Sequence, residues 1–237
     1  MPDKQIILLT MEQALDAVCY DFQQYEPQIL LFCEIIRLIS DGKLVIRGDT
    51  QKRGAWVSTP GRTNMRWLDG SDLVRHMCQT LGETNWTPDL LTAVCRRVFQ
   101  TKAEAVADPE NGRWGIRIHT GMEDFHCRQC GQCCRSLDYH DQLTAEDVAS
   151  WQACQQTEIL DWVGVFRGGG GQAVYRMWVR PGTTQLAETC PFLHQVASQN
   201  RWECRIHLVK PGICRNYPVS RKHALMTGCP GFGTRDG

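Results

Sequence analysis

The densest group of reactive side chains in this sequence is a run of four cysteines within eight residues. Cys127, Cys130, Cys133 and Cys134 form the pattern C-x2-C-G-x-C-C. Thiolates are metal ligands, and in a reducing compartment few other roles need so many of them together. We expect these four to act with four further cysteines, each in a turn-prone or short-strand context. The further four are Cys190, Cys204, Cys214 and Cys229.

The spacing of the first cysteines fits two kinds of thiolate site. A C-x2-C pair is half of a structural zinc site, and the same spacing begins the cluster-binding run of bacterial ferredoxins. A cysteine followed by proline also occurs in that run, as at Cys190 and Cys229, but the C-x3-C-P continuation is missing here. Spacing alone therefore predicts a metal site and leaves iron–sulfur and zinc open.

The adjacent pair Cys133 and Cys134 limits how many thiols can share one centre. Neighbouring side chains point to opposite faces of an extended chain and diverge by about 100° around a helix. We therefore expect only one of the pair to bind the first centre. On a helical turn, Cys130 and Cys134 would share a face, and Cys127 would join them one turn earlier. The eight thiols could supply two four-thiolate sites, or one cluster with spare thiols.

Other polar residues lie near these cysteines in the sequence. Arg135, Arg215 and Tyr217 are expected to brace the ligand loops, with anion binding or substrate positioning as the alternative. A nucleophile–base pair or paired carboxylates are absent from the sequence around the cysteines. A histidine near a metal cluster more often supports a ligand than binds the metal. The histidines that could complete a mixed site are His126, His140, His194 and His207.

Composition indicates a cytoplasmic protein without a nucleic-acid or membrane partner. Lys plus Arg and Asp plus Glu both number 26, so the net charge of zero favours no anionic partner. The N-terminal apolar run is too short for a signal peptide, and the most apolar segment, 29–39, is too short to span a membrane. Thirteen cysteines in such a chain are expected to be reduced thiols.

The N-terminal region reads as helical with a small hairpin. Thr10 and Gln13 form a capping box for a first helix, and 29–39 is a second helix. A hairpin is expected from 43–47 and 55–57, then helices over about 71–82 and from Pro88 to about Ala107. Five cysteines on helices are expected to pack in the core without metal. These are Cys19, Cys33, Cys78, Cys95 and Cys154.

Turn residues at 108–112 mark the expected domain boundary, with a strand at 114–119 opening the second part. Thr144 caps a further helix to about residue 156, and two strands flank the glycines 168–171. That glycine run lacks the strand-to-helix context of a phosphate loop. The predicted fold class is α+β: a helical N-terminal region, 1–112, packed on a loop-rich cysteine-cluster domain, 113–237.

The ordered motifs between about residues 120 and 232 resemble the YkgJ-type cysteine-cluster family, the CxxCxxCC proteins. The resemblance implies a bacterial, cytosolic, zinc- or iron-chelating domain. Many relatives have tyrosine at the position of His207 and arginine at that of Lys210, and neither difference affects a sulfur. The matching motifs are Phe125-x-Cys127-x2-Cys130-Gly131-x-Cys133-Cys134-Arg135, Leu143-Thr144-x-Glu146-Asp147-Val148, Cys190-Pro191-Phe192-Leu193, Cys204-x-Ile206-His207, Lys210-Pro211-x-x-Cys214-Arg215-x-Tyr217-Pro218 and Gly228-Cys229-Pro230.

Two hypotheses for function follow. The favoured one is a non-catalytic metalloprotein whose cysteines hold an iron–sulfur cluster, [4Fe-4S] in preference to others, with zinc as the alternative. Its N-terminal half would dock a protein partner. The other hypothesis is an enzyme with the cluster beside a substrate pocket. A related cysteine pattern occurs in flagellin lysine N-methylases, but this chain shows no glycine-rich methyl-donor loop.

Overall fold

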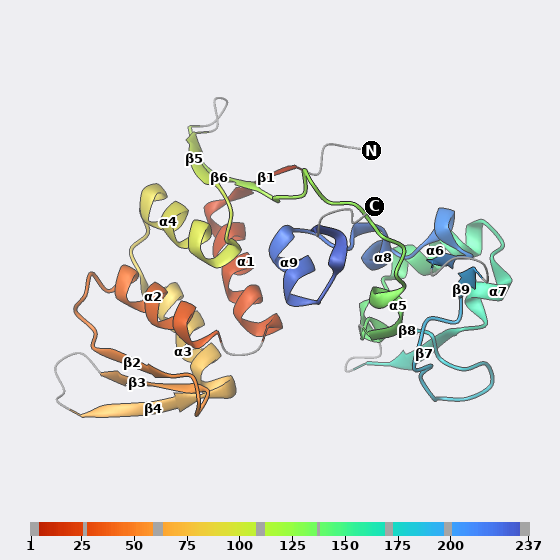
Figure 1. Cartoon of the computed structure of the whole chain (residues 1–237), viewed down its shortest axis with the longest axis horizontal. Coiled ribbons are helices and arrows are strands. Elements are labelled where there is room, and N and C mark those ends of the chain that lie inside the picture. The colour runs from red at the N-terminus through yellow and green to blue at the C-terminus, as the bar shows by residue number, and fades with distance from the viewer. Residues whose placement is uncertain are drawn as a thin grey trace. The chain divides into compact units, whose positions relative to one another are not determined.

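A computed structural model describes residues 5–25, 28–58, 64–107, 112–136, 138–168, 173–196 and 201–232 of the 237-residue chain. The chain divides into two compact units, Met1–Glu123 and Asp124–Gly237, shown in Figure 1. Helices and small antiparallel sheets occur in both units, which confirms the predicted α+β class. No helix in the described ranges is long and apolar enough to cross a membrane.

The N-terminal unit contains four helices and two three-stranded antiparallel sheets within its described residues. The strand orders are β1-β6-β5 and β2-β3-β4. Helices α1 and α4 contact the first sheet, and α2 and α3 contact the second, so the helices lie between the sheets (Figure 1). The elements are β1 (Ile6–Thr10), α1 (Met11–Gln24), α2 (Ile29–Ile39), β2 (Ile46–Asp49), β3 (Gly54–Ser58), β4 (Met65–Asp69), α3 (Gly70–Glu83), α4 (Pro88–Phe99), β5 (Ala103–Ala107) and β6 (Trp114–His119).

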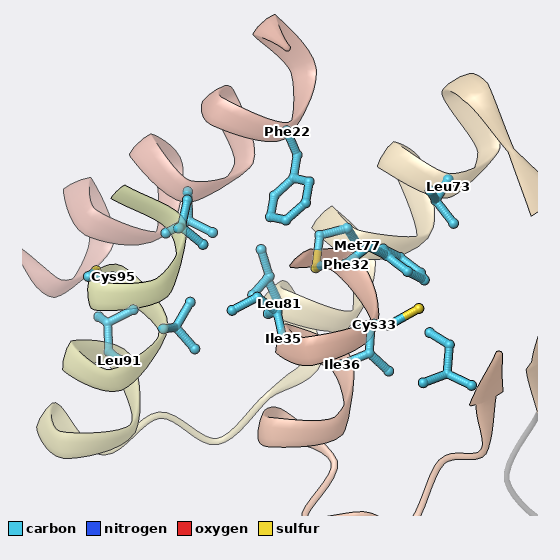
Figure 2. Packing of buried hydrophobic residues seen from close by; sticks show 14 of the residues in the cluster. Phe22, Phe32, Cys33, Ile35, Ile36, Leu73, Met77, Leu81, Leu91 and Cys95 are labelled. Carbon is cyan, nitrogen blue, oxygen red and sulfur yellow. The ribbon is translucent and has the colours of Figure 1, made fainter. Parts of the chain in front are cut away.

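Local signals in the sequence explain where these helices begin. The Thr10 hydroxyl accepts a hydrogen bond from the Gln13 amide, and the Gln13 side chain accepts one from the Thr10 amide, as the capping box predicts. The Thr87 hydroxyl accepts a hydrogen bond from the Leu90 amide and so caps α4, with Pro88 in the first turn. The buried faces of all four helices then meet in one apolar core (Figure 2).

Two expectations for the N-terminal unit are wrong in detail. Helix α4 ends at Phe99, because Gln100 adopts a left-handed conformation with φ of 52° and the chain continues into β5. Ala103 is buried and Glu104 is exposed, as opposite faces of a strand allow. The expected two-stranded hairpin forms as β2 and β3, but residues 65–69 add a third strand, β4, which makes a three-stranded meander.

The domain boundary also lies later in the chain than the sequence indicates. Strand β6 was expected to open the second domain, but it is the central strand of the first unit's sheet and pairs with both β1 and β5. Ile116 and Ile118 of β6 are buried in that unit's core. The division therefore falls between Glu123 and Asp124 instead of at 112/113.

The C-terminal unit is built from short elements around a smaller core. Strands β7 and β8 form one antiparallel hairpin, and β9 and β10 form another. Strands β7 and β8 are the two strands that the sequence predicts on either side of the glycine run. Residues 169–172 of that run lie outside the described residues. The aromatic centre of this core is Trp151, Trp178 and Phe192. The elements are α5 (Gln132–Ser136), η1 (His140–Gln142), α6 (Ala145–Ala153), α7 (Thr157–Leu160), β7 (Val163–Arg167), β8 (Ala173–Met177), β9 (Leu193–Val196), β10 (Arg201–Cys204), η2 (His207–Val209), α8 (Gly212–Asn216), α9 (Arg221–Met226) and η3 (Pro230–Phe232).

Candidate metal centre

The four cysteines of the C-x2-C-G-x-C-C run lie on a loop and the short helix that follows it. Cys127 and Cys130 are outside regular secondary structure, whereas Cys133 and Cys134 are in α5. The helical face expected for Cys127, Cys130 and Cys134 is therefore absent, because α5 begins only at Gln132. The loop makes its turn through left-handed residues at Gln129 and Gly131.

This loop is fastened to strand β10 through Trp202. The Trp202 amide donates to the Gln129 carbonyl at 2.7 Å. A Cβ atom at Gly131 would lie 2.8 Å from Cγ of Trp202, so only glycine allows this approach. The Arg135 guanidinium lies 5.0 Å from the Trp202 ring centroid and donates to the Cys130 carbonyl at 3.0 Å. Arg135 therefore braces the ligand loop, as expected from the sequence.

The end of the unit returns to the start of the same loop. The His126 amide donates to the Gly231 carbonyl at 3.0 Å. The rings of Phe125 and Phe232 lie 5.3 Å apart, centroid to centroid. Between α9 and η3, the Cys229 amide donates to the Ala224 carbonyl. These contacts bring the segment that contains Cys229 next to the loop that contains Cys127.

All eight cysteines line two adjoining pockets in the C-terminal unit. The first pocket is lined by Cys133, Cys134, Cys190, Cys204 and Cys214. The second shares four of these and adds the remaining three thiols, so a single region gathers cysteines from separate parts of the chain. The cysteines that line only the second pocket are Cys127, Cys130 and Cys229. Their role as metal ligands stays a prediction.

The adjacent thiols of Cys133 and Cys134 do not diverge as expected. Their sulfur atoms lie 3.9 Å apart. Two thiolates on one tetrahedral ion, each about 2.3 Å from it, are separated by about 3.8 Å. The divergence of about 100° applies to the Cα–Cβ bonds, and rotation about χ1 can still bring the two sulfurs together. Both thiols can therefore serve one centre.

Burial and mutual proximity shift the pKa values of several thiols in this region. Burial, followed by the nearby Cys134, Cys133 and Cys204, raises the pKa of Cys214 to about 12. A hydrogen bond with Cys134 and burial raise the pKa of Cys133 strongly. The hydrogen bond with Cys133 lowers the pKa of Cys134. The hydrogen bond with Cys190 and burial together outweigh this effect, and the pKa of Cys134 is raised to about 12. The hydrogen bond from Cys134 lowers the pKa of Cys190. A bound cation is the charge that would allow several such thiols to ionise together.

A buried carboxylate fixes the helix that carries Cys214. Asp147 is 4% exposed and accepts hydrogen bonds from the amide and hydroxyl of Thr144, which closes the capping box of α6. It also accepts from the Gly212 amide at 2.8 Å and from Nη2 of Arg215 at 3.3 Å. The sequence predicts the cap but not this second role, since Gly212 is 65 positions away. Arg215 therefore has a bracing contact, as expected.

The first pocket has apolar and aromatic walls beyond its thiols. Tyr139, Trp178 and Ile206 line it, together with Lys210. The Tyr139 hydroxyl is buried and has no hydrogen-bond partner among the described residues. Tyr217 also lines the pocket, and its hydroxyl lies 2.7 Å from the hydroxyl of Thr227, so it too has a bracing contact. The sequence gives no signal for Tyr139 or Trp178.

The histidines differ in their relation to the pockets. His140 lines the first pocket, and its ring contacts Asp138 and the Ala187 carbonyl at 2.6 and 3.0 Å. Both ring nitrogens are thus engaged, so His140 is a supporting residue in this structure. His207 lines the second pocket, while His126 and His194 are exposed and line neither.

The five remaining cysteines line neither pocket. Cys33 and Cys95 are buried, as expected for core residues. Cys19 and Cys78 are only half-buried. Cys154 is exposed at the C-terminal cap of α6, so the expectation that it packs in a core is wrong.

The donor atoms suit an all-thiolate metal group in kind. Soft thiolate ligands bind iron–sulfur clusters and zinc, and the pockets supply more thiols than any other donor. As they stand, no three His, Cys, Asp or Glu side chains in the described part of the chain form a group able to hold a metal ion. The chemistry of the donor set therefore fits, while the side chains are not arranged around a single ion.

Comparison with known proteins gives one match. Residues 126–230 match the family model CxxCxxCC, described as "Putative zinc- or iron-chelating domain". The match spans all eight pocket cysteines and confirms the family indicated by the sequence motifs. No curated protein and no solved structure matches the chain. The comparison supports metal binding in general and leaves the metal undetermined.

Proposed function

We propose that the C-terminal unit, in which residues 126–230 match the CxxCxxCC domain, binds an iron–sulfur cluster. A [4Fe-4S] cluster is favoured. The cluster would be held by thiolates from the two adjoining pockets. The proposed protein ligands are drawn from Cys127, Cys130, Cys133, Cys134, Cys190, Cys204, Cys214 and Cys229.

The observation that carries this proposal is the arrangement of the thiols around open space. The first pocket has a cavity volume of about 80 Å³ and the adjoining second pocket about 500 Å³, and both open to solvent. Five cysteines line the first pocket from four different segments of the chain. A polynuclear cluster needs room between its ligands, whereas a single zinc ion needs four donors within about 2.3 Å of one point.

The surrounding residues are suited to protecting such a group. Trp178 and Ile206 are buried walls that restrict water, and the potential of a cluster depends on its solvent exposure. Lys210 lines both pockets and brings a positive charge next to the thiolates. Asp147 and Arg135 hold two of the cysteine segments in place. When bound, an iron–sulfur cluster supplies reversible electron transfer.

The role we propose is structural, sensory or electron-transferring, in the cytoplasm, where thiols stay reduced. The N-terminal unit has its own core and sheets and contributes no cysteine to the pockets. We assign to it the docking of a protein partner.

The test is a visible spectrum of anaerobically purified full-length protein, with iron, sulfide and zinc measured on the same sample. The proposal predicts a broad visible absorption that bleaches on reduction, with about four iron and four sulfide per chain. A colourless protein containing zinc in place of iron would support the zinc alternative. A protein with neither metal under these conditions would refute metal binding by these cysteines.

A further inference from the structure

Two cysteines outside the candidate metal centre meet at the contact between α1 and α3. Cys19 is on α1 and Cys78 is on α3, and these helices pack against each other. The two thiols are close enough for Cys78 to raise the pKa of Cys19. Gln23, one helical turn after Cys19, places its Nε2 atom 4.0 Å from the Cys78 sulfur. Cys19 and Gln23 therefore both face Cys78 along one seam.

The exposure of this pair distinguishes it from the other cysteines of the N-terminal unit. Cys19 and Cys78 are half-buried, so a small solute can reach the seam. Cys33 and Cys95 are 3% and 0% exposed and lie within the apolar core. Reactive cysteines need access as well as a neighbouring thiol.

The helices on either side of the pair are held in place by buried neighbours. Val18 and Phe22 of α1 share a core with Met77 and Leu81 of α3, as Figure 2 shows for three of them. Each cysteine is thus next in sequence to a buried residue at the helix–helix contact. The two sulfurs can approach by side-chain rotation while the helices stay packed.

We propose that Cys19 and Cys78 form a reversible disulfide when the protein meets a peroxide. One thiol attacks hydrogen peroxide, the O–O bond breaks, and a sulfenic acid and water are formed. The second thiol attacks that sulfur, the S–O bond breaks, and a second water leaves with the thiol's proton. Two thiols and one hydrogen peroxide give one disulfide and two waters, and a small dithiol or thioredoxin-like reductant reverses the reaction.

The surroundings of the two thiols set the order of these steps. Burial and the contact with Cys78 raise the pKa of Cys19 to about 12, so Cys19 is seldom the thiolate that attacks peroxide. Cys78 has the Gln23 amide as a possible hydrogen-bond donor to its sulfur. Cys78 is the first thiol oxidised, and Cys19 resolves the sulfenic acid.

The test is disulfide mapping of the full-length chain after treatment with hydrogen peroxide. Free thiols are alkylated, and the protein is cut with trypsin and a protease that cleaves before aspartate. The peptides 16–20 and 76–88 then each carry a single cysteine, Cys19 or Cys78. We expect these two peptides linked after peroxide, and separated and alkylated after a reducing agent.

Matched variants show whether the link arises from this pair. Cys78→Ser should leave Cys19 alkylated after peroxide, while Cys154→Ser should leave the link unchanged. The disulfide closes a loop of about 60 residues, so oxidation should raise the unfolding midpoint of the N-terminal unit by at least about 5 °C in the unchanged chain and not in Cys78→Ser. Mapping of the unchanged chain is decisive even if a variant does not fold. Recovery of both peptides unlinked, or linked to pocket cysteines, would overturn the proposal.

Discussion

Replacing Asp147 by alanine should loosen the segment that carries Cys214 and lower metal retention. Asp147 is almost fully buried and joins the cap of α6 to the amide of Gly212 at the start of α8. Loss of the hydrogen bond that the Asp147 carboxylate accepts from the Thr144 amide costs about 1 kcal/mol, and loss of the one that it accepts from the Gly212 amide costs about 2 kcal/mol. The Arg215 contact adds little, because that side chain is 54% exposed. The free energy of unfolding of the C-terminal unit should fall by about 3 kcal/mol.

The assay is chemical denaturation with and without bound metal, together with metal content per chain. Supporting residues of metal ligands typically change affinity by about 10- to 100-fold, so the metal should be lost to a competing chelator at a correspondingly lower concentration. Asp147→Asn keeps an acceptor without the charge and should cost about 1 kcal/mol. The control is Glu146→Gln, an exposed carboxylate in the same first turn.

The outcome that would refute this reasoning is specific. If Asp147→Ala matches Glu146→Gln in both stability and metal retention, the link between α6 and α8 does not position Cys214. If stability falls but metal retention does not, Cys214 is outside the metal centre.

Three further perturbations have expected outcomes. Gly131→Ala places a residue with a side chain in a left-handed conformation and its Cβ against Trp202. Metal content should therefore fall, while the N-terminal unit keeps its melting transition. Metal content equal to that of the unchanged protein would contradict the loop geometry. Metal removal by a chelator should raise hydrogen exchange in 124–232 more than in 5–123, and an equal rise would argue against two separate units. Burial raises the pKa of Cys95 from 9.0 to about 12, so its stabilising effect is complete below pH 9 and is lost between pH 9 and 12. At pH 11 the loss is about 3 kcal/mol, and Cys95→Ala should show a shallower decline; parallel curves would contradict this.

Local signals in the sequence predicted many of the helix starts. The capping boxes at Thr10 and Thr144 and the Thr87–Pro88 start all form as expected, because each depends on atoms within one helical turn. The predicted ends of α4 and of the first domain were wrong, because the true ends depend on strand partners that are distant in sequence. Ile6 pairs with His119 across the first unit, and no local pattern encodes that pairing.

The same distinction holds for the candidate site. Close spacing and the motif order indicated which eight cysteines come together, because a dense cysteine pattern is rare without a metal. The sequence could not show that Cys133 and Cys134 point their sulfurs together, since χ1 decides this. It also could not show the contact between Asp147 and Gly212, or that Cys78 lies near Cys19.

The measurement that tests the central claim most directly is metal content per chain in two matched serine variants. Cys214 lines both pockets, whereas Cys154 is exposed and lines neither. Both variants and the unchanged protein are purified anaerobically and analysed for iron, sulfide and zinc. We predict that Cys214→Ser loses most of its metal and that Cys154→Ser keeps the full amount. Full metal content in a folded Cys214→Ser protein, or equal loss in both variants, would contradict the assignment of the metal to these pockets.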